Sequence, residues 1–173
     1  MAFDYALKAA PKQMNTIADL DITELKTLLQ RYNLNVIPVA LGENIPGSYW
    51  GDPETGIIKN DLYVRNDTPV HSVLHEACHY ICMLPEHRKN LHTDTGGDYD
   101  EENAVCYLQI ILSSFLRNMT FEKMFEDMDT WGYSFRLGSA RKWFYEDAED
   151  ALAWLLKYQI VDEFNNPTWN LRK

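Results

Sequence analysis

Residues 75–79 read His-Glu-Ala-Cys-His and fit the pattern His-Glu-x-x-His. In an α-helix, side chains four positions apart project from one face, so His75 and His79 can offer two imidazole nitrogens to one divalent cation. Glu76 then lies beside that cation, where its carboxylate can accept a proton from a water molecule. The pattern fixes only three positions, so its weight depends on the sequence around it.

The surrounding sequence predicts a helix that contains this motif. Thr68 can cap the helix, Pro69 suits its first turn, and Pro85 cannot continue it. An apolar stripe at helical spacing runs through Val70, Val73, Leu74, Ala77 and Ile81. Two imidazoles and a carboxylate inside a buried helix need partners, which a bound metal supplies. A helix with ordinary, hydrogen-bonded histidines is the alternative.

Length and composition indicate one packed domain over residues 1–173. The hydrophobic fraction is 46%, which argues against disorder, and the net charge is −10. Without a basic stripe we expect no direct nucleic-acid partner, and the acidity is that of a solvated surface. Met1 to Thr16 does not resemble a signal peptide, and no stretch is apolar enough to span a membrane.

The three cysteines, Cys78, Cys82 and Cys106, favour a cytoplasmic protein with reduced thiols. Cys78 and Cys82 are four residues apart on the motif helix, but without a second pair they read as small buried side chains rather than a metal site.

The pattern along the chain predicts an α+β fold with a short three-stranded sheet. Strands are expected over 36–41, at 48–50, and over 57–64; the last part, Leu62 to Val64, reads either as an edge strand that could pair with a peptide or as an ordinary buried strand. Helices are expected over 21–32, 68–84, 100–118, 121–128 and 139–158. Residues 1–17 read as an arm, 86–100 as a loop, and the chain from Asn165 as a loose end.

A catalytic zinc ion usually has three protein ligands. One known arrangement places a third histidine ten residues after the first, but Pro85 occupies that position. His87 and His92 remain without that spacing. A glutamate from the following helix is another source, and Glu101 and Glu102 open that helix.

Glu101 is favoured over Glu102 because its helical face continues into apolar residues. That face holds Ala104, Leu108, Ile111 and Leu112, whereas the face of Glu102 is mixed, with Val105, Gln109, Leu112 and Ser113. Acidic residues are also common at helix N-termini because of the helix dipole, so either glutamate can have that role instead.

The order of these parts resembles the ImmA/IrrE-type metallopeptidases, which are small gluzincin-like zinc proteins. Their second helix resembles Glu-x-x-Ala-Asn-x-Phe-Ala, and residues 101–108 match at Glu101, Ala104 and, loosely, Tyr107. The resemblance covers residues 20–116 and implies a zincin-like fold, in which the sheet packs on the motif helix and the glutamate helix. It also implies zinc held by His75, His79 and Glu101, with Glu76 as the base.

Two departures from that family pattern stand out. Val105 replaces an Asn or Asp that would hydrogen-bond a ligating histidine, and the helical extension over about 119–165 has no counterpart. The leading expectation is a zinc-dependent metallopeptidase that acts on a peptide or protein. A non-catalytic zinc-binding regulator or toxin–antitoxin component is the alternative that Val105 favours, and a zinc hydrolase of non-peptide amides is a third possibility.

A peptidase also needs a group that stabilises the oxyanion. His71, one turn before His75, is a candidate, as are Tyr133, Arg136 and Arg141. Each has a structural alternative: surface exposure for His71, aromatic packing for Tyr133, and ion pairs with nearby acids for the two arginines.

Overall fold

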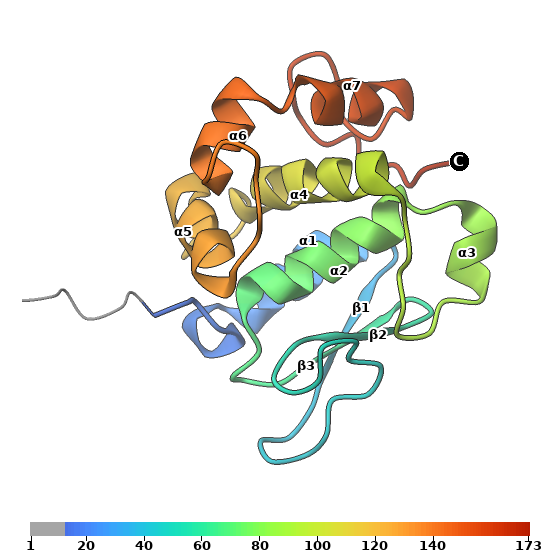
Figure 1. Ribbon diagram of the computed structural model, residues 1–173. Coiled ribbons are helices and arrows are strands. Elements are labelled where there is room, and N and C mark those ends of the chain that lie inside the picture. Colours follow the sequence, from blue (N-terminus) through green and yellow to red (C-terminus); the bar gives the residue numbers. More distant parts are fainter. Residues whose placement is uncertain (1–12) are drawn as a thin grey trace, which may run out of the picture.

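The structure is a computed structural model, and it describes residues 13–173 (Figure 1). Within them lie seven α-helices, three strands and a 3₁₀ turn at Ile17–Asp19, so the α+β prediction is confirmed. The elements are α1 (Ile22–Gln30), β1 (Asn35–Pro38), β2 (Gly56–Ile58), β3 (Asp61–Val64), α2 (Val70–Cys82), α3 (Pro85–Lys89), α4 (Tyr99–Ser113), α5 (Phe121–Trp131), α6 (Ala140–Glu146) and α7 (Glu149–Lys157).

The sheet has the order β1-β3-β2, with β3 parallel to β1 and antiparallel to β2. The interpretation of Leu62 to Val64 as an edge strand is therefore wrong, and the alternative of a buried central strand holds. The predicted strand at 48–50 contributes only one bridge, from Ser48 to Gly56. The segment 57–64 forms two strands instead of one, because the chain reverses at Lys59, whose φ is 54°.

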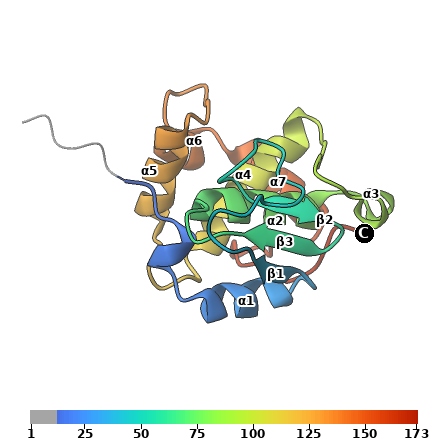
Figure 2. The ribbon, with the colours of Figure 1, turned by 90° about the horizontal axis from the view of Figure 1, so that it is seen from below.

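Helix α2 lies between the sheet and α4, and α7 packs on the other side of α4 (Figure 1). Seen from below, α1 lies beside β1 (Figure 2). Every residue of α2 is buried except His75, which is partly exposed. A helix enclosed on both sides must be apolar around most of its circumference, so the few polar groups it carries must find partners.

The boundaries of α2 follow the sequence, but its cap does not. The helix starts after Pro69 and ends before Pro85, as predicted. The hydroxyl of Thr68 accepts a hydrogen bond from the Arg65 amide at 2.9 Å rather than capping the helix, so its predicted role is wrong. Pro85 begins the short helix α3 within the segment that was expected to be a loop, as suits a proline at a first helical position.

The helical extension differs from its prediction in a break of its last helix and in the length of α5. The helix expected over 139–158 is broken at Asp147 and Ala148 into α6 and α7. The side chain of Asp147 is paired with Arg136 at this break. Helix α5 runs to Trp131 and ends at Gly132, which takes a left-handed conformation with φ of 109°.

Both ends of the described chain pack against α2 and its neighbours. The Asn15 amide donates to the Asp127 carboxylate at 3.0 Å, and its carbonyl accepts from Val70 at 2.9 Å. The Arg172 amide donates to the Ile81 carbonyl at 2.9 Å. The prediction of a loose end from Asn165 is therefore wrong, and so is the predicted arm over 13–17; the rest of that arm, residues 1–12, lies outside the described residues.

All three cysteines are buried and free, which agrees with the predicted reduced thiols. In the described part of the chain, no helix has both the length and the apolar character needed to cross a membrane.

Gly56 holds the turn at 46–48 against β2, which gives a test of this part of the fold. A Cβ at Gly56 would lie 1.7 Å from the Pro46 carbonyl oxygen. Gly56→Ala is expected to lower the free energy of unfolding by about 3 kcal/mol, because backbone must move. Gly42→Ala is the control, since its Cβ meets no atom within 4 Å and only its φ of 90° is strained. Equal losses in urea titrations of the two variants would contradict the described turn.

Candidate metal centre

The side chains of His75, His79 and Glu102 converge where α2 faces α4. The Nε2 atoms of the two histidines are 3.1 Å apart. Glu102 Oε1 lies 3.1 Å from His75 Nε2, and Glu102 Oε2 lies 2.9 Å from His79 Nε2. One donor atom from each residue lies within 4.8 Å of the others, so a single cation can contact all three.

The hydrogen bonds of Gln109 fix the proton on His75. Gln109 is fully buried, and its Nε2 donates to the His71 carbonyl oxygen at 3.2 Å, an atom that can only accept. Gln109 Oε1 therefore faces His75 Nδ1, at 2.9 Å, and accepts its proton. A cation bound here would take the lone pair of His75 Nε2, which is the atom directed at Glu102 and His79.

This arrangement fits a bound cation. His75 Nε2 and Glu102 Oε1 are 3.1 Å apart, so positive charge must lie between them, either a proton on Nε2 or a cation that takes its place. Burial lowers the pKa of His79, which favours its neutral, metal-binding form. Burial by itself would raise the pKa of Glu102, but its hydrogen bonds with His75 and His79 outweigh burial and hold that pKa below its usual value. Two imidazole nitrogens and a carboxylate are ligands that suit zinc.

The structure brings Glu102, and not Glu101, to the histidines, so the predicted preference for Glu101 is corrected here. Glu101 Oε2 pairs with Arg172 Nη1 at 3.4 Å, and both side chains are largely buried. Successive residues on a helix point about 100° apart, so the two glutamates cannot face the same point. The apolar stripe misled because α4 is buried continuously from Ala104 to Ser113 and therefore does not mark the face toward α2.

Gln109 supplies the hydrogen bond to a histidine that the family pattern assigns to an Asn or Asp at the position of Val105. It accepts from His75 and lies one turn after Val105 and two turns after Glu102 on α4. In the sequence, Gln109 stands out as a single amide in the apolar run 104–112. Because it lies on the face of Glu102, it made that face mixed and favoured Glu101. The second histidine is less well supported, because His79 Nδ1 is buried without a hydrogen-bond partner.

Glu76 lies next to this group in the way expected of a proton acceptor. It lines the same cleft and is 7% exposed, and its Oε2 has no hydrogen-bond partner among the described residues. Burial raises the pKa of Glu76 to about 7, partly opposed by His75 and reinforced by the negative charge of Glu102. A carboxyl group with such a pKa can both accept and release a proton near neutrality.

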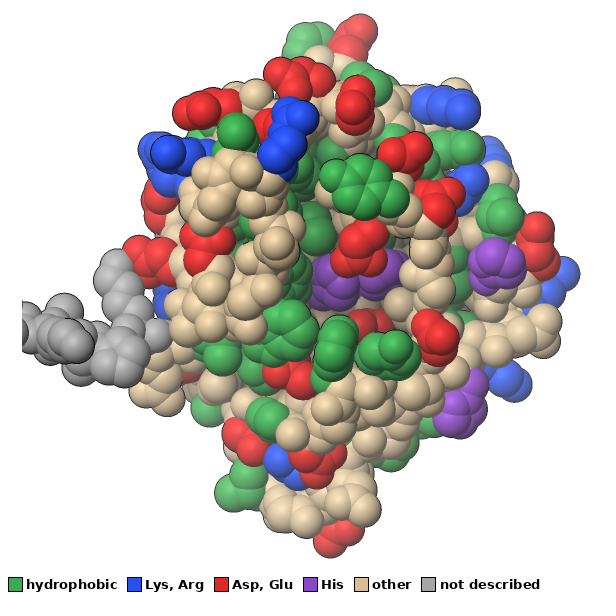
Figure 3. Space-filling view, viewed as in Figure 1, with side chains coloured by type: hydrophobic (Ala, Val, Ile, Leu, Met, Phe, Trp, Pro, Cys, Tyr) green, Lys and Arg blue, Asp and Glu red, His purple; other side chains and the backbone are tan. Residues whose placement is uncertain are grey.

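His75 and Glu102 line, together with Glu76, a cleft of about 300 Å³. In Figure 3 the imidazoles lie in a hollow at the centre of the face, with carboxyl groups and hydrophobic side chains around them. Glu54, Trp50 and Trp131 line one part of the cleft, and none of the three was singled out by the sequence. They come from a loop and from the end of a helix, far apart in the chain.

The candidates for oxyanion stabilisation separate into two groups. His71 and Tyr133 line the cleft, with His71 Nδ1 3.1 Å from the Tyr133 hydroxyl. His71 is buried, so its predicted exposure to solvent is wrong. Burial lowers the pKa of His71 to about 3, so this imidazole is neutral. Arg136 and Arg141 are absent from the lining of this cleft and instead pair with Asp147 and Glu122.

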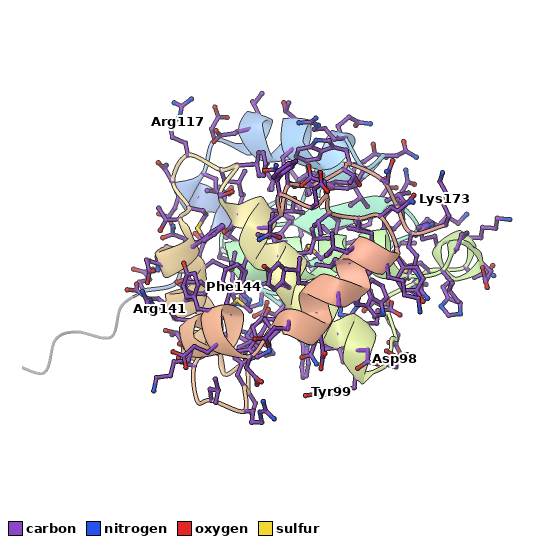
Figure 4. All side chains as sticks on the ribbon, turned by 90° about the horizontal axis from the view of Figure 1, so that it is seen from above. Asp98, Tyr99, Arg117, Arg141, Phe144 and Lys173 are labelled. Carbon is purple, nitrogen blue, oxygen red and sulfur yellow. The ribbon has the colours of Figure 1, made fainter. Side chains whose placement is uncertain are left out.

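Two further histidines and the rim of the cleft lie apart from the candidate ligands. Exposed His87 and His92 lie outside the group of ligands. Tyr99, at the N-terminal end of α4, is 79% exposed and stands at the rim of the cleft, whereas Arg141 lies at the outer edge of the helical extension (Figure 4).

Comparison of the chain with protein-family models, with curated proteins and with solved structures gave no match.

The assignment of Glu102 can be tested by metal content. Glu102→Gln is expected to weaken zinc affinity by more than about 100-fold, because a charged ligand is lost. Glu101→Gln is the matched control on the neighbouring residue, and it should keep stoichiometric zinc while losing its pair with Arg172. Competition against a chromophoric chelator measures both. Loss of zinc in the Glu101 variant alone would restore the original preference.

The role of Gln109 can be tested in the same assay. Gln109→Leu is expected to weaken zinc affinity by about 10- to 100-fold, because His75 loses the acceptor that fixes its proton. Ser113→Ala removes another buried polar group of α4, whose hydroxyl contacts only the Ile110 carbonyl, and should leave the affinity unchanged. Equal affinities for all three proteins would show that Gln109 does not orient the ligand.

Proposed function

We propose that this protein is a zinc-dependent metallopeptidase with a zincin-like, minimal gluzincin core. The single observation that carries the proposal is the convergence of His75, His79 and Glu102 beside a cleft that His75, Glu76 and Glu102 line. The order of helix, strands, motif helix and glutamate helix supports the resemblance to ImmA/IrrE-type metallopeptidases. That resemblance now rests on His75, Glu76 and His79, with Glu102 in place of Glu101.

The metal and the carboxylate divide the chemistry between them. Zinc held by the three ligands would supply a Lewis acid that polarises a carbonyl group and lowers the pKa of water. Glu76, whose Oε2 has no hydrogen-bond partner among the described residues, accepts the proton of the attacking water through its carboxylate and later delivers it to the leaving amine. Its burial excludes competing water from this carboxylate.

The surrounding residues hold His75 and its neighbours in place. Gln109 Nε2 lies 3.3 Å from the Tyr133 hydroxyl, whose ring stands edge-on to the His75 ring at 5.5 Å between centroids. The imidazole is thus fixed both by a hydrogen bond and by an aromatic neighbour. A ligand that cannot rotate loses little entropy when the cation binds.

A peptide would bind through the cleft walls rather than by extending the sheet. The central position of β3 removes the edge that was expected to pair with substrate. On the outer side of β2, Ile57 is already paired, since its amide donates to Gly47 and its carbonyl accepts from Thr93. Recognition therefore falls on side chains that line the cleft.

The alternative hypothesis of a non-catalytic zinc-binding protein is less well supported by the arrangement of the site than by the sequence alone. The feature that favoured it was the missing histidine partner at Val105, and Gln109 fills that role for His75. A structural zinc site is also normally closed by a fourth protein ligand. In the described residues the group has three members, and it opens onto a cleft.

Glu76→Gln separates the catalytic from the structural proposal. The variant is expected to bind zinc with unchanged stoichiometry and to lose peptide turnover by a factor of about 10² to 10⁴, because the amide cannot accept the proton. Zinc is measured by elemental analysis, and turnover with a mixture of quenched fluorogenic peptides. Glu86→Gln, on exposed α3, is the charge-matched control. Undiminished turnover in the Glu76 variant would overturn the mechanism.

A further inference from the structure

We propose that Glu54 forms a subsite for a cationic group of the substrate, beside the rings of Trp50 and Trp131. The group is an ammonium or guanidinium, carried either by a Lys or Arg side chain or by the free amino terminus. This inference rests on the proposed function, because it names the class of peptide that the cleft accepts.

Glu54 is a buried carboxylate that lines the cleft without a cationic partner. It is 9% exposed, and one hydrogen bond reaches its side chain from the described residues, from Trp131 Nε1 to Oε1 at 2.9 Å. None of the ion pairs in the part of the chain that the structure describes includes Glu54. A largely buried carboxylate that still lines a cleft is stabilised by positive charge that enters the cleft.

The charges of the cleft cannot satisfy Glu54 from within. The ionisable residues of its lining include Glu54, Glu76 and Glu102, and neither Lys nor Arg is among them. Zinc would balance the charge of its own ligand Glu102, and Glu76 exchanges a proton during turnover. Glu54 is therefore the lining carboxylate that is left for a cation brought by the substrate.

Two aromatic rings lie beside this carboxylate, Trp131 through its hydrogen bond and Trp50 through its contact with Trp131. The Trp50 and Trp131 rings meet at 75° with centroids 5.3 Å apart, and Trp131 is also 5.7 Å from the His71 ring. Trp50 is 64% exposed, so its ring is open to a ligand. Tryptophan faces attract ammonium and guanidinium groups, most strongly where water is excluded.

The loop that carries Glu54 is held firmly from both sides. The Asp52 carboxylate accepts from the Arg65 guanidinium at 2.8 Å and from the Ile45 amide at 3.0 Å. On the other side of Glu54, the Thr55 amide donates to the Ser72 hydroxyl of α2 at 3.1 Å. The carboxylate is thus fixed relative to the metal ligands before a substrate binds, which reduces the entropy lost on binding.

The closing experiment measures selectivity with N-acetylated, quenched fluorogenic hexapeptides on a glycine and alanine background. Lys, Arg, norleucine or Glu is placed at each position in turn. At one position, Lys and Arg are expected to raise kcat/KM at least about tenfold over norleucine, which has nearly the same shape without charge, and Glu to give the lowest value. The same peptides with a free amino terminus distinguish an α-amino group from a side chain as the source of the cation.

Substitution of Glu54 tests whether this carboxylate causes the preference. Glu54→Gln keeps an acceptor for Trp131 and should reduce the ratio between Lys and norleucine peptides to below about two. Glu86→Gln removes one negative charge outside the cleft and should leave that ratio unchanged. If Glu54→Gln does not fold, Trp50→Ala on the exposed rim serves instead and should lower the same ratio at least about threefold.

A binding arm separates this inference from the proposed function. The same peptides are titrated against the Glu76→Gln protein, and tryptophan fluorescence reports occupancy beside Trp50 and Trp131. Cleavage without any preference for a cation would overturn the subsite and leave the peptidase standing. Preferential binding of cationic peptides that requires Glu54, with no turnover by the unaltered protein, would support the subsite and overturn the peptidase. Absence of preference in both arms would overturn the subsite.

Discussion

The contact between α2 and α4 is the interaction on which the rest of the site depends. Helix α2 is buried on both sides, yet it carries three histidines and a glutamate. Polar groups in such a position are tolerated only where partners reach them. Helix α4 supplies partners for two of the imidazoles from one face, with Glu102 against His75 and His79 and Gln109 two turns later against His75. Fold stability and the candidate metal site therefore depend on the same packing.

The buried polar groups also limit how the chain can vary. A small shift of α4 relative to α2 would separate Glu102 from the histidines and leave Gln109 without its acceptor and donor roles. The amide of Gln109 satisfies His75, the His71 carbonyl and Tyr133 at once, so its orientation allows one proton arrangement. This network specifies the register of the two helices more sharply than apolar side chains do.

Sequence reasoning located the motif helix, its ends and the helix that brings a glutamate to the two motif histidines, because these follow from local patterns. The choice between Glu101 and Glu102 required knowledge of which face of α4 meets α2, and continuous burial of that helix concealed it. The error at Leu62 to Val64 has a similar origin. Strand order is set by which segments pair in space, and alternation of apolar residues does not report it. Packing of Arg172 and the cleft role of Glu54 depend on contacts between distant segments.

The enclosure of α2 has a consequence for how a ligand enters. Its side chains are packed against the sheet on one side and α4 on the other, which leaves little room for rearrangement. Adjustment must then fall on the surface segments that form the mouth of the cleft, around Trp50 and from Gly132 to Phe135. Amide hydrogens of the motif helix would exchange with solvent far more slowly than those of the mouth. A ligand would thus enter past flexible surface segments, while the groups it meets stand on a rigid, buried helix.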